Sequence, residues 1–211
     1  MLEFCAAQNP GFGWVQAQKI SVFPSMPLPE PTAARTLAHT RAVRFEGYKR
    51  EDGLWDIEGH LTDHSNRDAH LASGIRPRGE PIHEMRIRLT VTAELRIVEA
   101  VATSDMNPYP GFCDRIAPDY AKLAGLSLAR GFRKHVQELF GGIAGCTHLT
   151  EMLGQFPTAA IQAMAGEKRD NDDGKGKPFQ LDRCHALDTR GEAVARYYPR
   201  WFSSASTGPK K

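Results

Sequence analysis

The chain has 211 residues, of which 41% are hydrophobic and 25% charged, the composition of an ordinary globular protein. Its formal net charge of +2 argues against a nucleic-acid-binding surface, and no basic run interleaved with aromatic residues occurs. No apolar run is long enough to span a bilayer, and the N-terminus lacks the layout of a secretory signal. We therefore expect a cytoplasmic protein whose partner is a small molecule, with no nucleic acid and no membrane involved; its oligomeric state stays open.

The two ends of the chain differ from its middle. Residues 1–34 are rich in proline and lack periodic apolar positions, so they are predicted to form an irregular arm. One domain is expected over residues 35–202. Within it, the polar and glycine-rich residues 166–178 are predicted to be a mobile loop, and residues 203–211 a disordered tail.

The first informative stretch is a turn at Asp52-Gly53 followed by a strand. Side chains alternate between the two faces of a strand. One face then carries Trp55, Ile57 and Leu61, and the other carries Asp56, Glu58 and His60. Such a polar row is typical of a solvated sheet face, but two carboxylates and an imidazole in line also suit proton transfer or cation binding.

A second strand is predicted over residues 82–91, with a short turn leading to a third over residues 95–102. Strands this close in sequence pair as an antiparallel hairpin. The apolar face of the second strand consists of His83, Met85, Ile87, Leu89 and Val91. If the first two strands pair, Arg86 and Arg88 lie opposite the polar row. They then form a charge ladder with it, or line a cleft in which arginine binds a carboxylate while Glu58 or His60 moves a proton.

Helices are predicted over residues 117–165. One apolar helix face consists of Leu128, Phe132, Val136, Leu139 and Phe140, and Gly141-Gly142 ends that helix. A second helix begins near Thr147 and turns Leu149, Met152, Leu153 and Phe156 inward, and Pro157 kinks or restarts it. Residues 185–198 suggest a C-terminal hairpin. The fold class is therefore α+β, an antiparallel sheet from about residues 40–103 plus that hairpin, covered on one face by helices.

Two candidate groups sit on the apolar side. His83 is either a core residue bonded to a carbonyl or a side chain pointing into a pocket between sheet and helices. The glycines at 141, 142 and 145 precede a helix start at Cys146, beside His148 and Glu151. A helix start lowers the pKa of a thiol, so Cys146 is either a reactive thiol or a small buried side chain under a helix cap with Thr147 as the N-cap.

The four cysteines form no Cys-x-x-Cys pair, so a disulfide or zinc-finger framework is not indicated. No cofactor is expected. If a metal binds, the candidate ligands are Cys146, His148, Cys184 and His185. Phosphate loops, dinucleotide-binding glycine motifs and serine-hydrolase elbows are absent from the sequence.

Several motifs resemble one bacterial family, the domain of unknown function 2889. They are Gly47-Tyr48-x-Arg50-Glu51-Asp52-Gly53-Leu54-Trp55-Asp56-Ile57-Glu58-Gly59, Ile82-His83-x-Met85, Gly145-Cys146-Thr147-His148-Leu149-Thr150-Glu151 and Cys184-His185-Ala186-Leu187. The resemblance runs from about Met26 to Trp201 and supplies no activity. Members are often encoded among genes for bacterial breakdown of aromatic compounds, which implies a small-molecule role.

The first hypothesis is a small enzyme without an organic cofactor, a lyase or hydrolase acting on an aromatic or related organic acid. Its reacting groups would come from His83, Cys146, His148, Glu58 and His60, with Arg86, Tyr109 and Trp55 binding the substrate. The alternatives are a non-catalytic binding protein of aromatic catabolism and a Cys/His metal-binding protein. Glu58 and His60 lie on the opposite sheet face from His83, so the two candidate sites exclude each other, and the His83 and Cys146 side is favoured.

Overall fold

The computed structural model describes residues 28–166 and 176–204. Residues up to Thr36 form a unit separate from Leu37 onward. In that first unit the described residues, 28–36, are exposed and carry no helix or strand. The expected loop at 166–178 and tail at 203–211 fall mostly outside the described residues.

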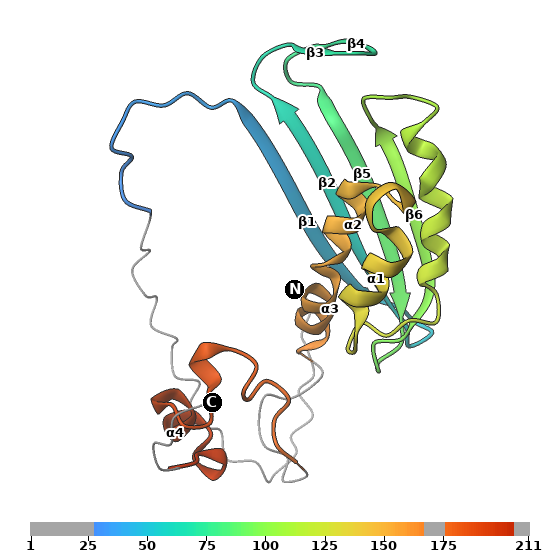
Figure 1. The fold of residues 1–211 in the computed structure, drawn as a ribbon. Coiled ribbons are helices and arrows are strands. Elements are labelled where there is room, and N and C mark those ends of the chain that lie inside the picture. The colour runs from blue at the N-terminus through green and yellow to red at the C-terminus, as the bar shows by residue number, and fades with distance from the viewer. Residues whose placement is uncertain (1–27, 167–175, 205–211) are drawn as a thin grey trace, which may run out of the picture. The chain divides into compact units, whose positions relative to one another are not determined.

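The centre of the fold is an antiparallel sheet in the order β1-β2-β5-β6 (Figure 1). Its strands are β1 (His39–Lys49), β2 (Trp55–Ser65), β5 (Pro81–Val91) and β6 (Ile97–Met106). Between β2 and β5 the chain forms a small separate hairpin of β3 (Ala69–Leu71) and β4 (Gly74–Arg76). The antiparallel sheet predicted for about residues 40–103 is confirmed.

One face of the sheet is apolar and buried, as alternation predicted. Its inward positions include Ile57 and Leu61 of β2 and Ile87 and Leu89 of β5, each at most 1% exposed. On the other face, Glu58 lies opposite Arg88 and His60 opposite Arg86. The register therefore separates an apolar row from a charged row on the same two strands.

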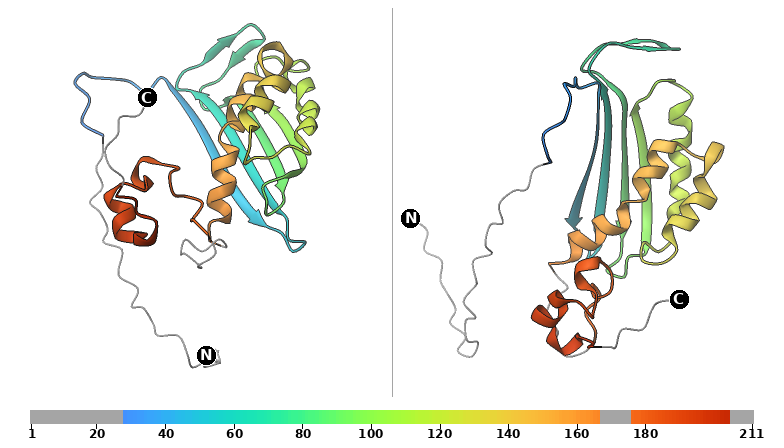
Figure 2. Two further views of the ribbon diagram at one scale, coloured as in Figure 1. Left: turned by 60° about the horizontal axis from the view of Figure 1, so that its bottom comes forward. Right: turned by 60° about the vertical axis from the view of Figure 1, so that its left-hand side comes forward.

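Helices cover the apolar face (Figure 2). They are the 3-10 helix η1 (Cys113–Leu123), α1 (Phe132–Phe140), the short η2 (Gly142–Ala144), α2 (Thr147–Leu153) and α3 (Phe156–Met164). As predicted, α1 ends before Gly141, α2 begins at Thr147, and Pro157 lies in the first turn of α3. None of the helices in the described residues is long and apolar enough to cross a membrane.

The predicted face of the first long helix is wrong in two places. The α-helix begins only at Phe132, because Ser127 pairs with Arg96 in an isolated bridge and holds the preceding segment extended. Leu128 still reaches the core from that segment, whereas Leu139 is 37% exposed.

The predicted C-terminal hairpin is also wrong. The described residues there form η3 (His185–Leu187), α4 (Glu192–Tyr197) and η4 (Pro199–Trp201). The Asp182 carboxylate accepts hydrogen bonds from the backbone and hydroxyl of Thr189, and Asp188 accepts one from the backbone of Arg190. These side-chain bonds close local turns in place of a strand ladder, and helix-favouring residues then follow Gly191.

Two glycines of the sheet allow α3 to lie close against it. A Cβ at Gly47 of β1 would collide with the Cβ of Ala163, and one at Gly59 of β2 would press on the rings of Phe45 and Phe156. Those two rings pack edge to face with centroids 5.0 Å apart. The contact fixes α3 across β1 and β2.

We expect Gly47→Ala to destabilise the domain by about 1–3 kcal/mol, because the added methyl group overpacks the contact with Ala163. Thermal or denaturant unfolding measures the loss. Adding Ala163→Gly should restore most of it. Gly176→Ala serves as the control, since a Cβ there meets no atom within 4 Å; an equal loss in this control would contradict the close contact between α3 and β1.

Candidate functional site

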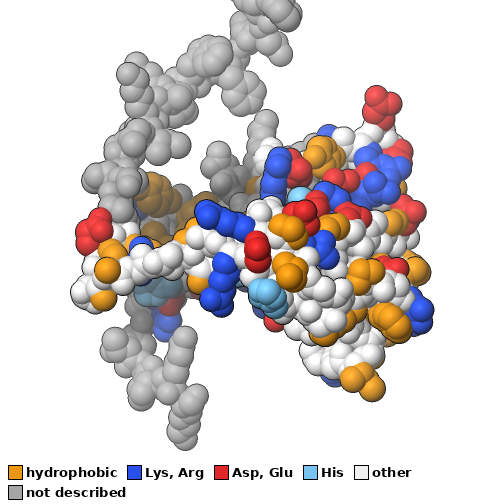
Figure 3. Space-filling model, turned by 90° about the horizontal axis from the view of Figure 1, so that it is seen from above, with side chains coloured by type: hydrophobic (Ala, Val, Ile, Leu, Met, Phe, Trp, Pro, Cys, Tyr) orange, Lys and Arg blue, Asp and Glu red, His pale blue; other side chains and the backbone are white. Residues whose placement is uncertain are grey.

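The apolar face of the sheet turns polar at one end. Asp63 continues the inward row of β2, and the register sets Arg41 of β1 and His83 of β5 directly beside it. This is the end from which the β3–β4 hairpin extends (Figure 1). Seen from above, charged side chains of both signs and histidines lie among hydrophobic ones on this end (Figure 3), so no single sign of charge dominates the surface.

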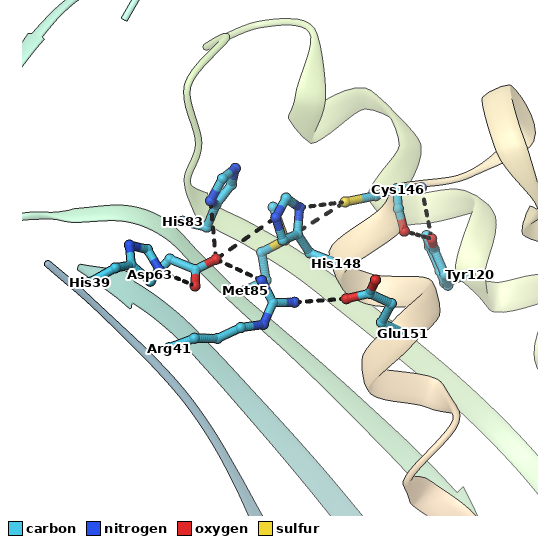
Figure 4. A network of polar contacts seen from close by, with 9 residues as sticks. All are labelled: His39, Arg41, Asp63, His83, Met85, Tyr120, Cys146, His148 and Glu151. Atoms are coloured by element: carbon cyan, nitrogen blue, oxygen red, sulfur yellow. Dashed lines mark hydrogen bonds and ion pairs between the residues drawn. The ribbon is translucent and has the colours of Figure 1, made fainter. Parts of the chain in front are cut away.

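The Asp63 carboxylate is the centre of the cluster, and the residue is only 3% exposed. Its Oδ1 lies 3.0 Å from His39 Nε2, and its Oδ2 accepts a 3.0 Å hydrogen bond from Arg41 Nη1 (Figure 4). Arg41 also donates through Nη2 to Glu151 of α2, at 3.1 Å. Arg41 thus ties the sheet edge to the helix that carries His148.

Two imidazoles complete the cluster. His83 Nδ1 lies 3.2 Å from Asp63 Oδ2, and His148 Nε2 lies 3.8 Å from the same oxygen. The two rings lie nearly face to face, with centroids 3.9 Å apart and planes 33° apart. His83 Nδ1 is within ion-pair reach of the carboxylate, but its direction does not meet hydrogen-bond geometry, so this buried atom has no hydrogen-bond partner.

The start of α2 is held in place by a buried tyrosine. The Tyr120 hydroxyl accepts a 3.0 Å hydrogen bond from the backbone N–H of Cys146 and lies 3.0 Å from Thr150 Oγ1. Its ring stacks on Phe140 with centroids 4.2 Å apart. Gly145 lies against the backbone of Phe140, where a side chain would collide. These contacts fix the direction in which His148 leaves the helix.

Cys146 lies beside His148, on the far side of its ring from Asp63 (Figure 4). Its Sγ is 3.9 Å from His148 Nδ1 and 3.8 Å from Met85 Sδ. Cys146, and not Thr147, is the N-cap of α2, and its side chain makes no capping hydrogen bond. The thiol is half-buried, so it contacts both the core and the cluster.

Both imidazoles are held neutral. Burial lowers the pKa of His83, and the neighbouring His148 lowers it further, against the opposite pull of Asp63. Burial also lowers the pKa of His148, together with the positive charge of Arg41, again against Asp63. At neutral pH both rings therefore keep an unprotonated nitrogen.

The structure brings His83, Cys146 and His148 together and leaves Glu58 and His60 on the opposite face. There, His60 Nε2 lies 3.0 Å from Glu84 Oε1, and Arg86 is paired with Glu84 and Asp105. A groove of about 240 Å³ runs over this face. The lining residues include Glu58, His60, Arg86 and Arg88.

The two aromatic residues expected to bind substrate differ in exposure. Trp55 is 7% exposed and belongs to the core, so its ring is not open to a ligand. Tyr109 is 51% exposed, in the segment between β6 and η1.

Of the four metal ligands expected from the sequence, His148 alone belongs to the group that the described residues bring together. Among the described residues, the group whose ligand atoms are spaced for one ion consists of Asp63, His83 and His148. Cys184 and His185 belong to the C-terminal segment, where they line a separate groove of about 330 Å³ with Asp182, Asp188 and Arg190. Cys146 and His148 are neighbours, but Cys146 is not part of the group.

Asp63, His39 and Arg41 were missed in the sequence, although the pattern contained an indication. Asp63 falls on the same alternating face as Trp55, Ile57 and Leu61. A carboxylate that continues an apolar row needs buried partners, because an isolated buried charge is costly. The same alternation places His39 and Arg41 inward on β1.

Neutral imidazoles beside a buried carboxylate have two chemical uses. Such nitrogens take or give a proton, with the carboxylate orienting the ring, or they bind a metal ion. Both uses activate water or a polar group of a substrate. The side chains of His83 and His148 are 16% and 26% exposed, so the centre is reached from solvent.

Comparison with known proteins identifies a family. A family model described as a protein of unknown function (DUF2889) matches residues 39–162, which include the whole cluster. No curated protein and no solved structure matches the chain.

We expect the free energy of unfolding to fall as the pH drops below about 6.5, the ordinary pKa of histidine. The unfolded chain takes up protons in that range, whereas His83 and His148, whose pKa values are lowered by folding, take them up only at lower pH. The loss stops once the folded imidazoles are also protonated. Denaturant unfolding across about pH 5 to 7.5 measures it.

His148→Gln should weaken this pH dependence, because one of the two shifted groups is gone. His135→Gln removes an exposed histidine of α1 and should leave the dependence unchanged. A His148→Gln curve as steep as that of the unmodified protein would contradict the assignment.

Proposed function

The chain belongs to the DUF2889 family of proteins of unknown function, and we propose that it is an enzyme that hydrolyses a small organic acid derivative, or eliminates a group from it, at the Asp63–His83–His148 centre. One observation supports this most directly: two neutral imidazoles converge on a buried carboxylate while remaining open to solvent. That arrangement supplies what hydrolases and lyases need, a group that activates water or removes a proton.

In this proposal His148 is nearest the reacting atoms, because its side chain is more exposed than that of His83. Asp63 and His83 lie behind it and set the local charge. Arg41 donates one N–H to Asp63 and another to Glu151, so its remaining N–H groups are available to the substrate's carboxylate. Its side chain is 34% exposed.

Aromatic acids are the first substrates to test, because the resemblance to the family implies a role in aromatic catabolism. The segment between β6 and η1 offers exposed aromatic rings at Tyr109 and Phe112.

The test is a screen of aromatic acids and their esters and amides with the full chain, with products identified by mass spectrometry. We expect turnover of at least one compound class. His148→Ala and His83→Ala should each lower kcat by about 10²-fold or more, since positioned proton-transfer groups contribute at this scale. His60→Gln, on the opposite face, should keep the rate.

Two results would contradict the proposed activity. One is the absence of turnover across the panel by the folded protein. The other is turnover that survives both histidine substitutions but falls in His60→Gln, which would move the reaction to the groove on the opposite face.

A further inference from the structure

We propose that Asp63, His83 and His148 bind one divalent transition-metal ion, through Asp63 Oδ2, His83 Nδ1 and His148 Nε2. The three residues come from β2, β5 and α2, so an ion would join the sheet to the helix layer. One ligand atom of each lies within 4.8 Å of those of the other two. Binding itself does not depend on the proposed activity; only the ion's part in the reaction rests on it.

The distances suit a single ion. Nitrogen and oxygen ligands lie about 2.0–2.2 Å from zinc, so two ligands of one tetrahedral ion are about 3.3–3.6 Å apart. The separation between His83 Nδ1 and Asp63 Oδ2 is 3.2 Å, close to that range. The separation between His148 Nε2 and the same oxygen is 3.8 Å, a few tenths of an ångström above that range.

The hydrogen bonds around the cluster leave a place for a cation. His39 lies against Asp63 Oδ1, whereas Oδ2 accepts the hydrogen bond from Arg41 and also faces the two imidazoles. His83 Nδ1 is buried there without a hydrogen-bond partner. One positive ion bound to the carboxylate oxygen and to both ring nitrogens would satisfy all three atoms, which lie within 4.8 Å of one another.

The surrounding residues fit the usual support of a metal site. Metal-bound histidines donate their other ring N–H to an acceptor, and bound carboxylates are themselves hydrogen-bonded. Cys146 Sγ, 3.9 Å from His148 Nδ1, is that acceptor for His148. Arg41 and His39 support Asp63. Cys146 therefore orients a ligand and is not itself a ligand, since the two ring nitrogens point to opposite sides of His148 (Figure 4).

The ligand set selects the class of ion. Magnesium and calcium prefer sites made entirely of oxygen, whereas two imidazoles and one carboxylate suit zinc or ferrous iron. Three protein ligands leave a coordination position open for water or substrate, as in catalytic zinc sites. In the proposed enzyme, the ion would lower the pKa of a bound water and polarise the substrate carbonyl.

The test begins with protein freed of metal by a chelator, loaded with Zn²⁺, dialysed and analysed for bound metal. We expect about one Zn²⁺ per chain, and a melting temperature that rises with Zn²⁺ concentration because the ion binds the folded state. His83→Gln, His148→Gln and Asp63→Asn should lose stoichiometric binding. Arg41→Gln should weaken binding by about 10- to 100-fold, as expected for a residue that supports a ligand.

A matched control should keep stoichiometric Zn²⁺: His135→Gln removes an exposed histidine of α1 that is not part of the cluster. Absence of stoichiometric metal in the unmodified protein, retention by His148→Gln, or loss in His135→Gln would each overturn the site.

Cobalt substitution tests the ligand set in the unmodified chain, and so does not depend on whether a variant folds. Co²⁺ in a nitrogen and oxygen site of low coordination number gives visible absorption bands without a sulfur-to-metal charge-transfer band. We expect that spectrum. A strong charge-transfer band would assign Cys146 as a ligand and overturn the Asp63–His83–His148 set.

The outcomes for the ion and for the activity are separable. Stoichiometric metal with no turnover across the substrate panel would contradict the enzyme and leave the metal site standing. Turnover by chelated, metal-free protein that still depends on His148 would support the enzyme and overturn the ion's part in it.

Discussion

The structure of the cluster depends on one buried charge, the carboxylate of Asp63. A charge in the interior persists only with partners close by, and removing one member of a buried pair typically costs about 3–5 kcal/mol. Here His39 and Arg41 supply hydrogen bonds, while His83 and His148 face the same group. The inward positions of these four polar side chains are therefore explained by one residue of β2.

The strand register brings these partners together. Arg41, Asp63 and His83 are neighbours across three antiparallel strands, and a slip of one residue would turn Asp63 toward the opposite face. The apolar row behind Asp63 prevents such a slip, because Ile57 and Leu61 would then leave the core. His148 comes from elsewhere in the sequence, on a helix start that the buried Tyr120 hydroxyl fixes.

Much of the fold could be predicted from the sequence, because alternation and helix stops are local. The two faces of β2 and β5, the end of α1 at Gly141 and the start of α2 at Thr147 are of this kind. The prediction of a C-terminal hairpin is wrong because the carboxylates of Asp182 and Asp188 accept hydrogen bonds that close local turns. The pattern of apolar residues does not reveal these turns.

The candidate site could be predicted only in part, because the sequence shows local patterns but not the contacts between strands. His83, Cys146 and His148 were placed together because each lies on an apolar face or at a helix start. Asp63 and Arg41 could not be assigned to the site from the sequence, because they come together only through the pairing of β1 with β2.

Stability gives no reason for a carboxylate at position 63. The pair of Glu58 and Arg88 on the outer face, at 3.8 Å, is solvated and adds well under about 1 kcal/mol to the free energy of unfolding. A buried network of charges is often less stable than apolar residues of similar volume. The inward cluster therefore gives less stability than apolar side chains would give at the same positions. The binding or catalytic role that we propose for it would account for its presence.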